Sequence, residues 1–224
     1  MNVRLTPSGL LGVMLARRGA IEVRLGAAGR RDLDLIRETR ATVPLLLTDA
    51  AALQIIAAVR GTRGLGGAMA EAGVLMGGSA RLIAAVKDGT PLHLFDMFDT
   101  QPPVDDTAGR EVRDHFGDIR GDRRSVERLL AGYDGIRLHP GAFPVSAKGL
   151  EHERFAFVHL DMDLVSSTRA ALAFFLPRLL PGGILVGDDY ADPGVRHCFA
   201  EAGIGRADTM IELPWGQVLL IKRG

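Results

Sequence analysis

The chain has 224 residues, of which 47% are hydrophobic and 24% are charged. This composition is typical of a single globular domain with a sizeable core, and it excludes a disordered chain. Lysine plus arginine and aspartate plus glutamate each number 27, so the formal net charge is zero, which argues against nucleic acid or an anionic membrane surface as the main partner.

The number of cysteines and the length of the apolar runs indicate the cellular compartment in which the protein works. The single cysteine, Cys198, rules out a disulfide framework within the chain and fits a reducing environment. Residues 1–20 contain a short apolar run without a small-residue cleavage pattern, so we expect no signal peptide. We also expect no membrane span, because no run of about 18 apolar residues is present. These features predict a cytoplasmic protein.

Residues 1–65 are predicted to form a helical N-terminal extension that packs on the core. The clearer of its two helices can be capped by Thr48 or Asp49 and ends at Gly61. The other segment, 19–43, is rich in arginine, glycine and aspartate and shows no clear pattern.

Strand and helix patterns alternate from about residue 67 to the C-terminus. The expected strands span 67–74, 91–98, 135–141, 155–163 and 182–189. The expected helices span 79–87, 122–132 and 166–180. We expect the last helix to start at a serine cap and to end near Pro177 and Pro181, and residues 208–224 to form a closing hairpin. The order predicts an α/β fold with a parallel sheet covered on both faces and a late antiparallel addition.

A glycine-rich turn, EAGVLMGGS at 71–79, joins the first expected strand to the first helix. Gly73 and Gly77 permit a tight turn and the close approach of a ligand to the backbone. The spacing matches neither the dinucleotide fingerprint nor a P-loop. Asp96 follows about 20 residues later, where a carboxylate suits the two hydroxyls of a ribose. The glycines could form only a turn and Asp96 could be only a loop acid, but Glu71 and Asp96 at two strand ends favour nucleoside binding.

Two acidic pairs, Asp161/Asp163 and Asp188/Asp189, follow the last two strands of the expected parallel sheet. Asp161 and Asp163 alternate with one residue between them, so in a strand they would face the same side. Asp188 lies 27 residues after Asp161, enough for one crossover helix, and a right-handed crossover would bring the two strand ends together. Carboxylates gathered there would repel each other unless a cation sat between them, and oxygen ligands favour Mg²⁺, Mn²⁺ or Ca²⁺. The alternative is that the acids only cap helices and turns.

Histidine carries less information. His159 alternates with Asp161 but lies in an apolar strand, so we favour a core histidine over a ligand or a base. His139 ends a short expected strand, so it lies nearer the edge of the sheet at which we expect the strand ends and the acidic pairs to meet; we call this edge the rim.

Two other families share the D-x-D pattern at Asp161 and Asp163. Haloacid-dehalogenase-like phosphatases need a lysine between their two acidic motifs, and residues 164–187 contain none. A D-x-D glycosyltransferase needs a nucleotide diphosphate pocket, and Arg81 is the only basic residue near the glycine turn. Metal-dependent phosphoryl or glycosyl transfer therefore stays as an alternative function.

The motifs EAGVLMGGS, LFDMFDTQPP, IRLHPGAF, FVHLDMDLVSST and LLPGGILVGDDY resemble, in this order, the macrocin O-methyltransferase family. The match covers about residues 45–200. The resemblance implies a Rossmann-like class I methyltransferase fold over 66–224, with a mostly parallel seven-stranded sheet and a final antiparallel strand. It implies S-adenosylmethionine and a divalent metal such as Mg²⁺ as cofactors, and a hydroxylated small molecule in antibiotic biosynthesis as the acceptor. We further expect a homo-oligomer, a dimer or higher.

Carried over position by position, the resemblance assigns roles to individual residues. The cofactor loop would be Glu71, Gly73, Gly77 and Ser79, the ribose acid Asp96, and the segment beside the adenine Gly141, Ala142 and Phe143. Asp161, Asp188 and Asp189 would be the metal ligands, with Asp161 also beside the cofactor. The chain departs from the family at Val165 and Ser166, where an aromatic residue and an acid are usual, and we therefore expect a different acceptor.

The implied chemistry is an in-line displacement at carbon, which requires the acceptor oxygen to be held about 3 Å from the methyl group. A metal that binds the hydroxyl would lower its pKa, and a nearby carboxylate could take the proton. Catechol O-methyltransferases place a lysine base where this chain has Leu164. We therefore expect Asp161 as the base, with Asp163 and His139 as alternatives. A non-catalytic relative that only binds S-adenosylmethionine is the competing hypothesis.

Overall fold

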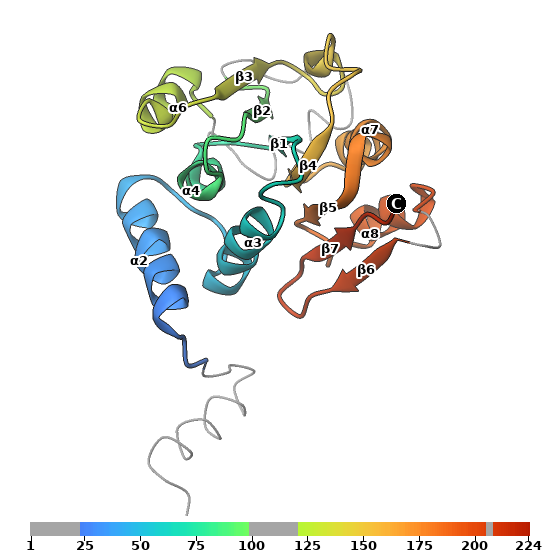
Figure 1. Cartoon of the computed structure of the whole chain (residues 1–224). Helices are drawn as coiled ribbons and strands as arrows, with labels where there is room; N and C mark the ends of the chain where they lie inside the picture. The colour runs from blue at the N-terminus through green and yellow to red at the C-terminus, as the bar shows by residue number, and fades with distance from the viewer. Residues whose placement is uncertain (1–22, 99–120, 205–207) are drawn as a thin grey trace, which may run out of the picture.

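The structure is a computed structural model that describes residues 23–98, 121–204 and 208–224. The expectation of no signal peptide in residues 1–20 and the last part of the LFDMFDTQPP motif lie outside these ranges. Within them, the chain folds around one sheet with helices on both of its faces (Figure 1).

The sheet has seven strands in the order β3-β2-β1-β4-β5-β7-β6. The strands are β1 (Ala68–Ala72), β2 (Leu92–Asp96), β3 (Ile136–Pro140), β4 (Phe155–Leu160), β5 (Leu179–Gly187), β6 (Thr209–Glu212) and β7 (Val218–Ile221). Neighbouring strands from β3 to β5 pair in parallel, whereas β7 is antiparallel to both β5 and β6. The predicted α/β class, the parallel sheet and the final antiparallel strand are confirmed.

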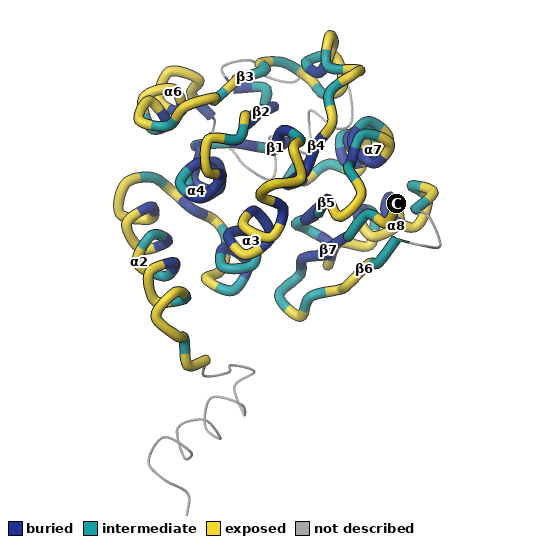
Figure 2. The backbone as a smooth tube through the Cα atoms, in the orientation of Figure 1, coloured by how far each residue is buried: buried dark blue, intermediate teal, exposed yellow. Residues whose placement is uncertain are grey.

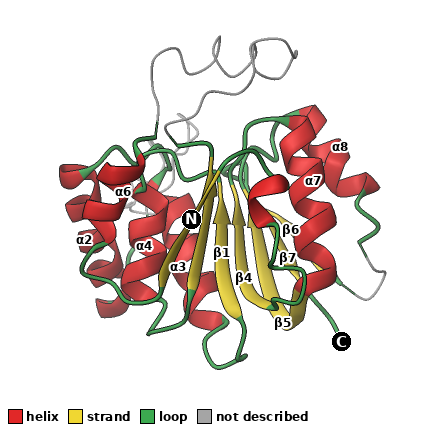
Figure 3. Ribbon diagram, turned by 90° about the horizontal axis from the view of Figure 1, so that it is seen from above, coloured by secondary structure: helices red, strands yellow, loops and turns green. Residues whose placement is uncertain are grey.

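The helices form two layers that enclose the sheet (Figure 3). They are α2 (Ala27–Thr42), α3 (Asp49–Gly61), α4 (Gly78–Val86), α6 (Arg123–Leu130), α7 (Val165–Phe175) and α8 (Pro193–Glu201). One buried cluster joins α2, α3, α4 and α6 to one face of the sheet, and a second joins α7 and α8 to the other. Among the described residues, no helix combines the length and the apolar character that a membrane span requires.

Helix α3 belongs to the core. The Thr48 side chain caps it as expected, by accepting a hydrogen bond from the Ala51 amide at 3.2 Å. Ile55 and Ile56 have no exposed surface and lie in the same cluster as strands β1, β2 and β4. Figure 2 shows buried stretches of the backbone in α3. A helix that comes before the first strand in the sequence therefore covers the centre of the sheet.

Two local predictions were wrong, and one helix was not predicted. Helix α7 has no serine cap: it starts at Val165 after Leu164, and no side chain caps its first turn. The segment expected as its last turn, Leu176–Arg178, is a short 3₁₀ helix, and β5 already begins at Leu179. Helix α8 was not predicted, although an aspartate followed by a proline, as at Asp192, is a signal for the start of a helix. The Asp192 side chain caps the helix by accepting hydrogen bonds from the amides of Gly194 and Val195.

Candidate functional site

The site lies where the chain order of the strands reverses, between β1 and β4. Strand β1 is followed by β2 on one side, while β4 and β5 lie on the other. The Asp161 amide donates to the Ala72 carbonyl at 2.9 Å, and the Asp188 amide donates to the Leu160 carbonyl at 2.8 Å. The ends of β1, β4 and β5 are thus joined at one rim, and in open α/β sheets ligands bind at such a switch point.

Three aspartates gather at this rim. One carboxylate oxygen each from Asp161, Asp163 and Asp189 lies within 4.8 Å of the others. Strand β4 ends at Leu160, so strand alternation does not bring Asp163 into the group as predicted. Asp163 and Asp189 both have a φ of 56°, a left-handed conformation that aspartate tolerates better than most residues. The two turns, rather than the strands, aim these side chains.

Asp161 is the aspartate of this group that follows β4 directly. Burial raises the pKa of its carboxyl well above the usual range, and the neighbouring carboxylate of Asp188 raises the pKa further. A carboxylate with a raised pKa holds a proton more readily than an ordinary aspartate. Asp161 is therefore suited to accept a proton.

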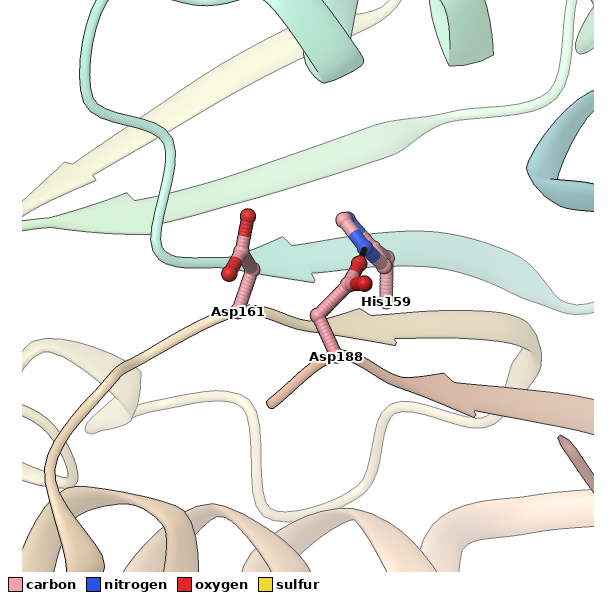
Figure 4. Close-up of side chains that lie close together, drawn as sticks. All are labelled: His159, Asp161 and Asp188. Atoms are coloured by element: carbon pink, nitrogen blue, oxygen red, sulfur yellow. Dashed lines mark hydrogen bonds and ion pairs between the residues drawn. The ribbon is translucent and has the colours of Figure 1, made fainter. Parts of the chain in front are cut away.

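His159 is fully buried between two carboxylates. Its Nδ1 lies 2.7 Å from Oε1 of Glu71. Its Nε2 lies 2.6 Å from Oδ2 of Asp188 (Figure 4). Burial alone would lower the pKa of the imidazole, but the hydrogen bonds to Asp188 and Glu71 outweigh it and hold the pKa well above its usual range. The prediction of a core histidine is confirmed, but its two carboxylate partners were not predicted; Glu71 and His159 are register partners on adjacent strands.

Two further residues join this network, and no pattern in the sequence pointed to either. Gln217 is fully buried, and its amide nitrogen donates to Oδ2 of Asp188 at 3.1 Å. Its oxygen accepts from the Trp215 indole at 3.0 Å. Gln217 and Trp215 belong to the connection between β6 and β7, which lies beside β5 only because β7 inserts there.

Glu71 lies deeper than predicted. Its side chain has no exposed surface, and Oε2 has no hydrogen-bond partner among the described residues. It faces His159 rather than the rim, so the geometry gives no support to a direct cofactor contact of Glu71.

Asp96 stands at the end of β2 and fixes the glycine turn. Its Oδ2 accepts from the amides of Val74 and Leu75 at 2.7 and 2.8 Å, and its Oδ1 accepts from the amide of Phe98 at 2.8 Å. A carboxylate oxygen can accept two hydrogen bonds, so Oδ1 retains one position. That position suits a hydroxyl donor such as a ribose.

The glycines of the turn are needed for contacts within the protein. A side chain at Gly73 would place its Cβ 1.6 Å from the carbonyl oxygen of Asp161, and one at Gly78 would meet the Pro44 carbonyl at 2.6 Å. Gly77 has a φ of 86° and begins α4 without a side-chain cap, while Ser79 is buried in its first turn. The glycines thus let the turn pack against the end of β4, and the start of α4 keeps uncapped amides.

His139 does not join the aspartates. It lies on the α7 face, stacked on Phe95 at 4.6 Å, whereas Glu71 and His159 lie on the other face with Met69. Strands β2 and β1 separate it from β4, about 14 Å at the usual strand spacing.

The imidazole of His139 is already engaged by a second histidine. Its Nε2 lies 2.9 Å from Nδ1 of His93, whose Nε2 faces the Arg137 guanidinium at 3.5 Å. A guanidinium can only donate, so His93 donates from Nδ1 and occupies the lone pair of His139 Nε2. Burial lowers the pKa of both histidines, that of His93 to about 4.

The segment after β3 lies beside these rings. The Gly141 amide donates to the Asp96 carbonyl at 2.9 Å, and the Ala142 carbonyl accepts from the Ser146 amide at 3.0 Å. The Phe143 ring packs against those of Phe95 and Phe175. Gly141 therefore joins the ends of β3 and β2, next to the oxygen that Asp96 leaves available.

The donor set at the rim fits a hard cation. Asp161, Asp163 and Asp189 offer only carboxylate oxygens, the ligands that Mg²⁺, Mn²⁺ and Ca²⁺ prefer. A second group, His159 with Asp161 and Asp188, also lies within 4.8 Å. Both ring nitrogens of His159 already face carboxylates, so this histidine has no lone pair to offer a metal.

Several named methyltransferases are similar to this chain in sequence or in structure. Residues 70–190, more than half of the chain, match the family described as "Methyltransferase domain". A tetracenomycin rhamnosyl 4'-O-methyltransferase from Streptomyces olivaceus is 34% identical over 142 residues, 57% of this chain and 54% of the relative. The mycinamicin III 3''-O-methyltransferase from Micromonospora griseorubida is 30% identical over 169 residues, 67% of this chain and 66% of the relative. The match thus spans about half to two thirds of these relatives, and it confirms the resemblance to sugar O-methyltransferases.

Comparison of the fold with solved structures agrees with the sequence comparison. The solved structure of the O-methyltransferase NovP superposes with a TM-score of 0.64 at 23% identity, over 76% of this chain and 78% of that protein. The predicted class I methyltransferase fold is confirmed.

Proposed function

Because the chain belongs to the methyltransferase domain family, we propose that it transfers a methyl group from S-adenosylmethionine to a hydroxyl of a sugar-like natural product with the help of a divalent cation. The observation that carries the proposal is the contact between two parts of the rim. The turn at Gly73 packs directly against the backbone of Asp161, so a ligand on the glycine turn would lie next to the aspartates.

The cofactor would lie over the ends of β1, β2 and β3. Asp96 would accept a hydrogen bond from the ribose at Oδ1, and the uncapped amides of α4 would face its polar end. Gly141, Ala142 and Phe143 would border the adenine. S-adenosylmethionine, when bound, supplies a methyl group on a positively charged sulfur.

The cation would be held by Asp161 and Asp189, with Asp163 and Asp188 as further carboxylate ligands at the same rim. A hard cation, when bound, acts as a Lewis acid on the acceptor hydroxyl. Two neighbouring hydroxyls on one sugar ring would suit such a site best. Mg²⁺, Mn²⁺ and Ca²⁺ all fit the donor set.

Asp161 would take the proton of the acceptor hydroxyl on its carboxylate. With that proton on Asp161, the acceptor oxygen could take the methyl group that bound S-adenosylmethionine would supply, and the cofactor would be left as a neutral thioether. The position of Asp161, between the glycine turn and the other aspartates, supports this role. Asp163 is the alternative base on the same rim, and His139 lies on the other face of the sheet.

The acceptor class follows from the two sugar-modifying relatives. In this chain the position where the family usually has an aromatic residue is Val165, two residues after the D-x-D motif, and this residue is 39% exposed at the start of α7. A valine there leaves more room than the aromatic residue usual in the family. We propose a glycosylated natural product from an antibiotic pathway as the acceptor and a cytoplasmic site of action.

Phosphoryl or glycosyl transfer is disfavoured by the family match. A non-catalytic relative is disfavoured because Asp161, Asp188 and Asp189 are all present at the rim. Both alternatives predict no methyl transfer to any acceptor.

The proposal is tested with methyl-labelled S-adenosylmethionine and two acceptors, a rhamnosylated tetracenomycin and mycinamicin III. We expect label in at least one product, loss of transfer in EDTA and recovery with added Mg²⁺. Full transfer in EDTA would disprove the role of the cation. Failure to bind S-adenosylhomocysteine in calorimetry would disprove the cofactor and with it the whole proposal.

A further inference from the structure

Five side chains form one hydrogen-bonded chain behind the rim. It runs from Glu71 on β1 through His159 on β4 to Asp188 after β5, and then through Gln217 to Trp215 between β6 and β7. Its four hydrogen bonds measure 2.7, 2.6, 3.1 and 3.0 Å in this order. We call these five residues the Glu71–Trp215 chain.

We propose that the Glu71–Trp215 chain positions Asp188 for the cation site, by fixing one carboxylate oxygen inside the fold and leaving the other for the rim. The inference rests on the proposed function and deepens it. His159 and Gln217 are then positioning residues that touch neither cofactor nor acceptor.

The geometry at Asp188 supports this role. Both His159 and Gln217 bond to the same oxygen, Oδ2, and no hydrogen bond among the described residues ends on Oδ1. The terminal torsion of an aspartate is broad when nothing holds it. Two donors, one from β4 and one from the β6–β7 connection, remove that freedom, so Asp188 presents one defined oxygen.

The burial of the chain explains why it would be rigid. Glu71, His159 and Gln217 have no exposed surface, and 12% of the Asp188 side chain is exposed. A buried polar group that loses its partner cannot recover the bond from water. The chain therefore has one low-energy arrangement, and its only accessible carboxylate end is Asp188.

The first test measures the binding of Mn²⁺ to the whole protein with S-adenosylhomocysteine present. In His159→Gln and Gln217→Met we expect the affinity for Mn²⁺ to fall by about 10- to 100-fold, the usual effect of removing a residue that orients a ligand. The affinity for S-adenosylhomocysteine should not change, because Asp96 and the glycine turn lie outside the chain.

The matched control is His93→Gln, which removes another fully buried histidine from a strand of the same sheet. This variant should lose stability but keep its Mn²⁺ affinity. If Mn²⁺ binds both His159→Gln and Gln217→Met as tightly as the unaltered protein, the inference is wrong while the proposed function stands. Gln217→Met serves as the test should His159→Gln fail to fold.

The second test is independent of metal and of activity. In nuclear magnetic resonance spectra, both ring N–H protons of His159 should lie far downfield and exchange slowly, because each is buried in a short bond to a carboxylate. Both signals should vanish in His159→Gln, and the Nε2 signal should move in Gln217→Met.

The two tests separate the possible failures. If the unaltered protein lacks the downfield signals, the Glu71–Trp215 chain of hydrogen bonds does not exist, whatever the activity of the protein. Protein that shows the signals but binds no Mn²⁺ would overturn the role of the chain at a cation site, together with the cation in the proposed function. Protein that shows the signals and binds Mn²⁺ in the expected order, yet methylates no acceptor, would disprove only the proposed acceptor.

Discussion

At the scale of single residues, the four aspartates at the rim differ in their surroundings, although they look alike in the sequence. Asp161 has a raised pKa, Asp163 and Asp189 are aimed by left-handed turns, and Asp188 is held by hydrogen bonds. The role of each carboxylate follows from what surrounds it rather than from the residue type. The residues can therefore be separated by mutation.

The proton acceptor can be identified by comparing two variants. Asp161→Asn should abolish turnover, because an amide cannot take the hydroxyl proton, while its affinity for S-adenosylmethionine changes little. His139→Ala should lower turnover by at most about tenfold, since His139 lies on the other face of the sheet. Turnover of both is measured at saturating metal and cofactor. An inactive His139→Ala beside an active Asp161→Asn would point to the histidine.

The left-handed backbone at Asp163 should be visible in stability. Replacing Asp163 by asparagine or glycine should preserve the free energy of unfolding, because both residues tolerate a φ of 56°. Asp163→Ala should cost about 1 kcal/mol from backbone strain. Urea unfolding of the three variants checks this order, and equal stability of the alanine and asparagine variants would contradict it.

The buried His93 should make stability depend on pH. In the folded protein its pKa is lowered to about 4 by burial, whereas in the unfolded chain it is near 6.5. Between pH 6.5 and 4 the unfolded chain therefore binds more protons, and folding stability falls as the pH falls. The contribution of His93 at pH 4 is about 3 kcal/mol by this shift.

The measurement is urea unfolding of His93→Phe at several pH values between 7 and 4.5. The variant should lose less stability on acidification than the unaltered protein. The exposed His152 provides the control, and His152→Gln should retain the full pH dependence. An unchanged slope in His93→Phe would show that this histidine does not cause it.

At the scale of elements, α3 and the β6–β7 hairpin contribute more than their place in the sequence suggests. Helix α3 precedes the first strand but covers β4 and β5, and the hairpin brings Gln217 to Asp188. We propose that residues 1–65 are an extension packed on the methyltransferase domain at 66–224. The described part of this extension, α2 and α3, shares the cluster that fills one face of the sheet.

The contribution of α3 can be measured with one substitution. Ile56 has no exposed surface, so Ile56→Ala should reduce the free energy of unfolding by about 2–5 kcal/mol through lost burial and a cavity. Leu46, in the connection before α3, is 70% exposed, and Leu46→Ala should change stability by no more than about 0.5 kcal/mol. Similar values for the two variants would mean that α3 is not part of the core.

At the scale of the whole molecule, the prediction of a homo-oligomer is still to be tested. Strand β6 lies at one edge of the sheet and carries Met210 and Ile211, which are 40% and 44% exposed. Association along this edge would cover both side chains. Sedimentation velocity should show a dimer or a larger species, and a monomer at all concentrations would disprove the prediction.

The sequence by itself determined the alternating elements, the antiparallel end of the sheet, and the position of the aspartates at strand ends. These features depend on local patterns: hydrophobic periodicity, turn residues and the distance between motifs. The adjacency of β4 and β5 also followed, because one crossover helix separates them. Even α8 carried a local start signal at Asp192 that could have been recognised.

Only the tertiary structure decided which of these residues meet. The pairing of Glu71 with His159 depends on the register between two strands that are far apart in the sequence. The contact of Gln217 with Asp188 depends on β7 inserting beside β5, and the separation of His139 depends on the strand order and on the face it occupies. Register, strand order and face are properties of the packed sheet, so no local pattern could have fixed them.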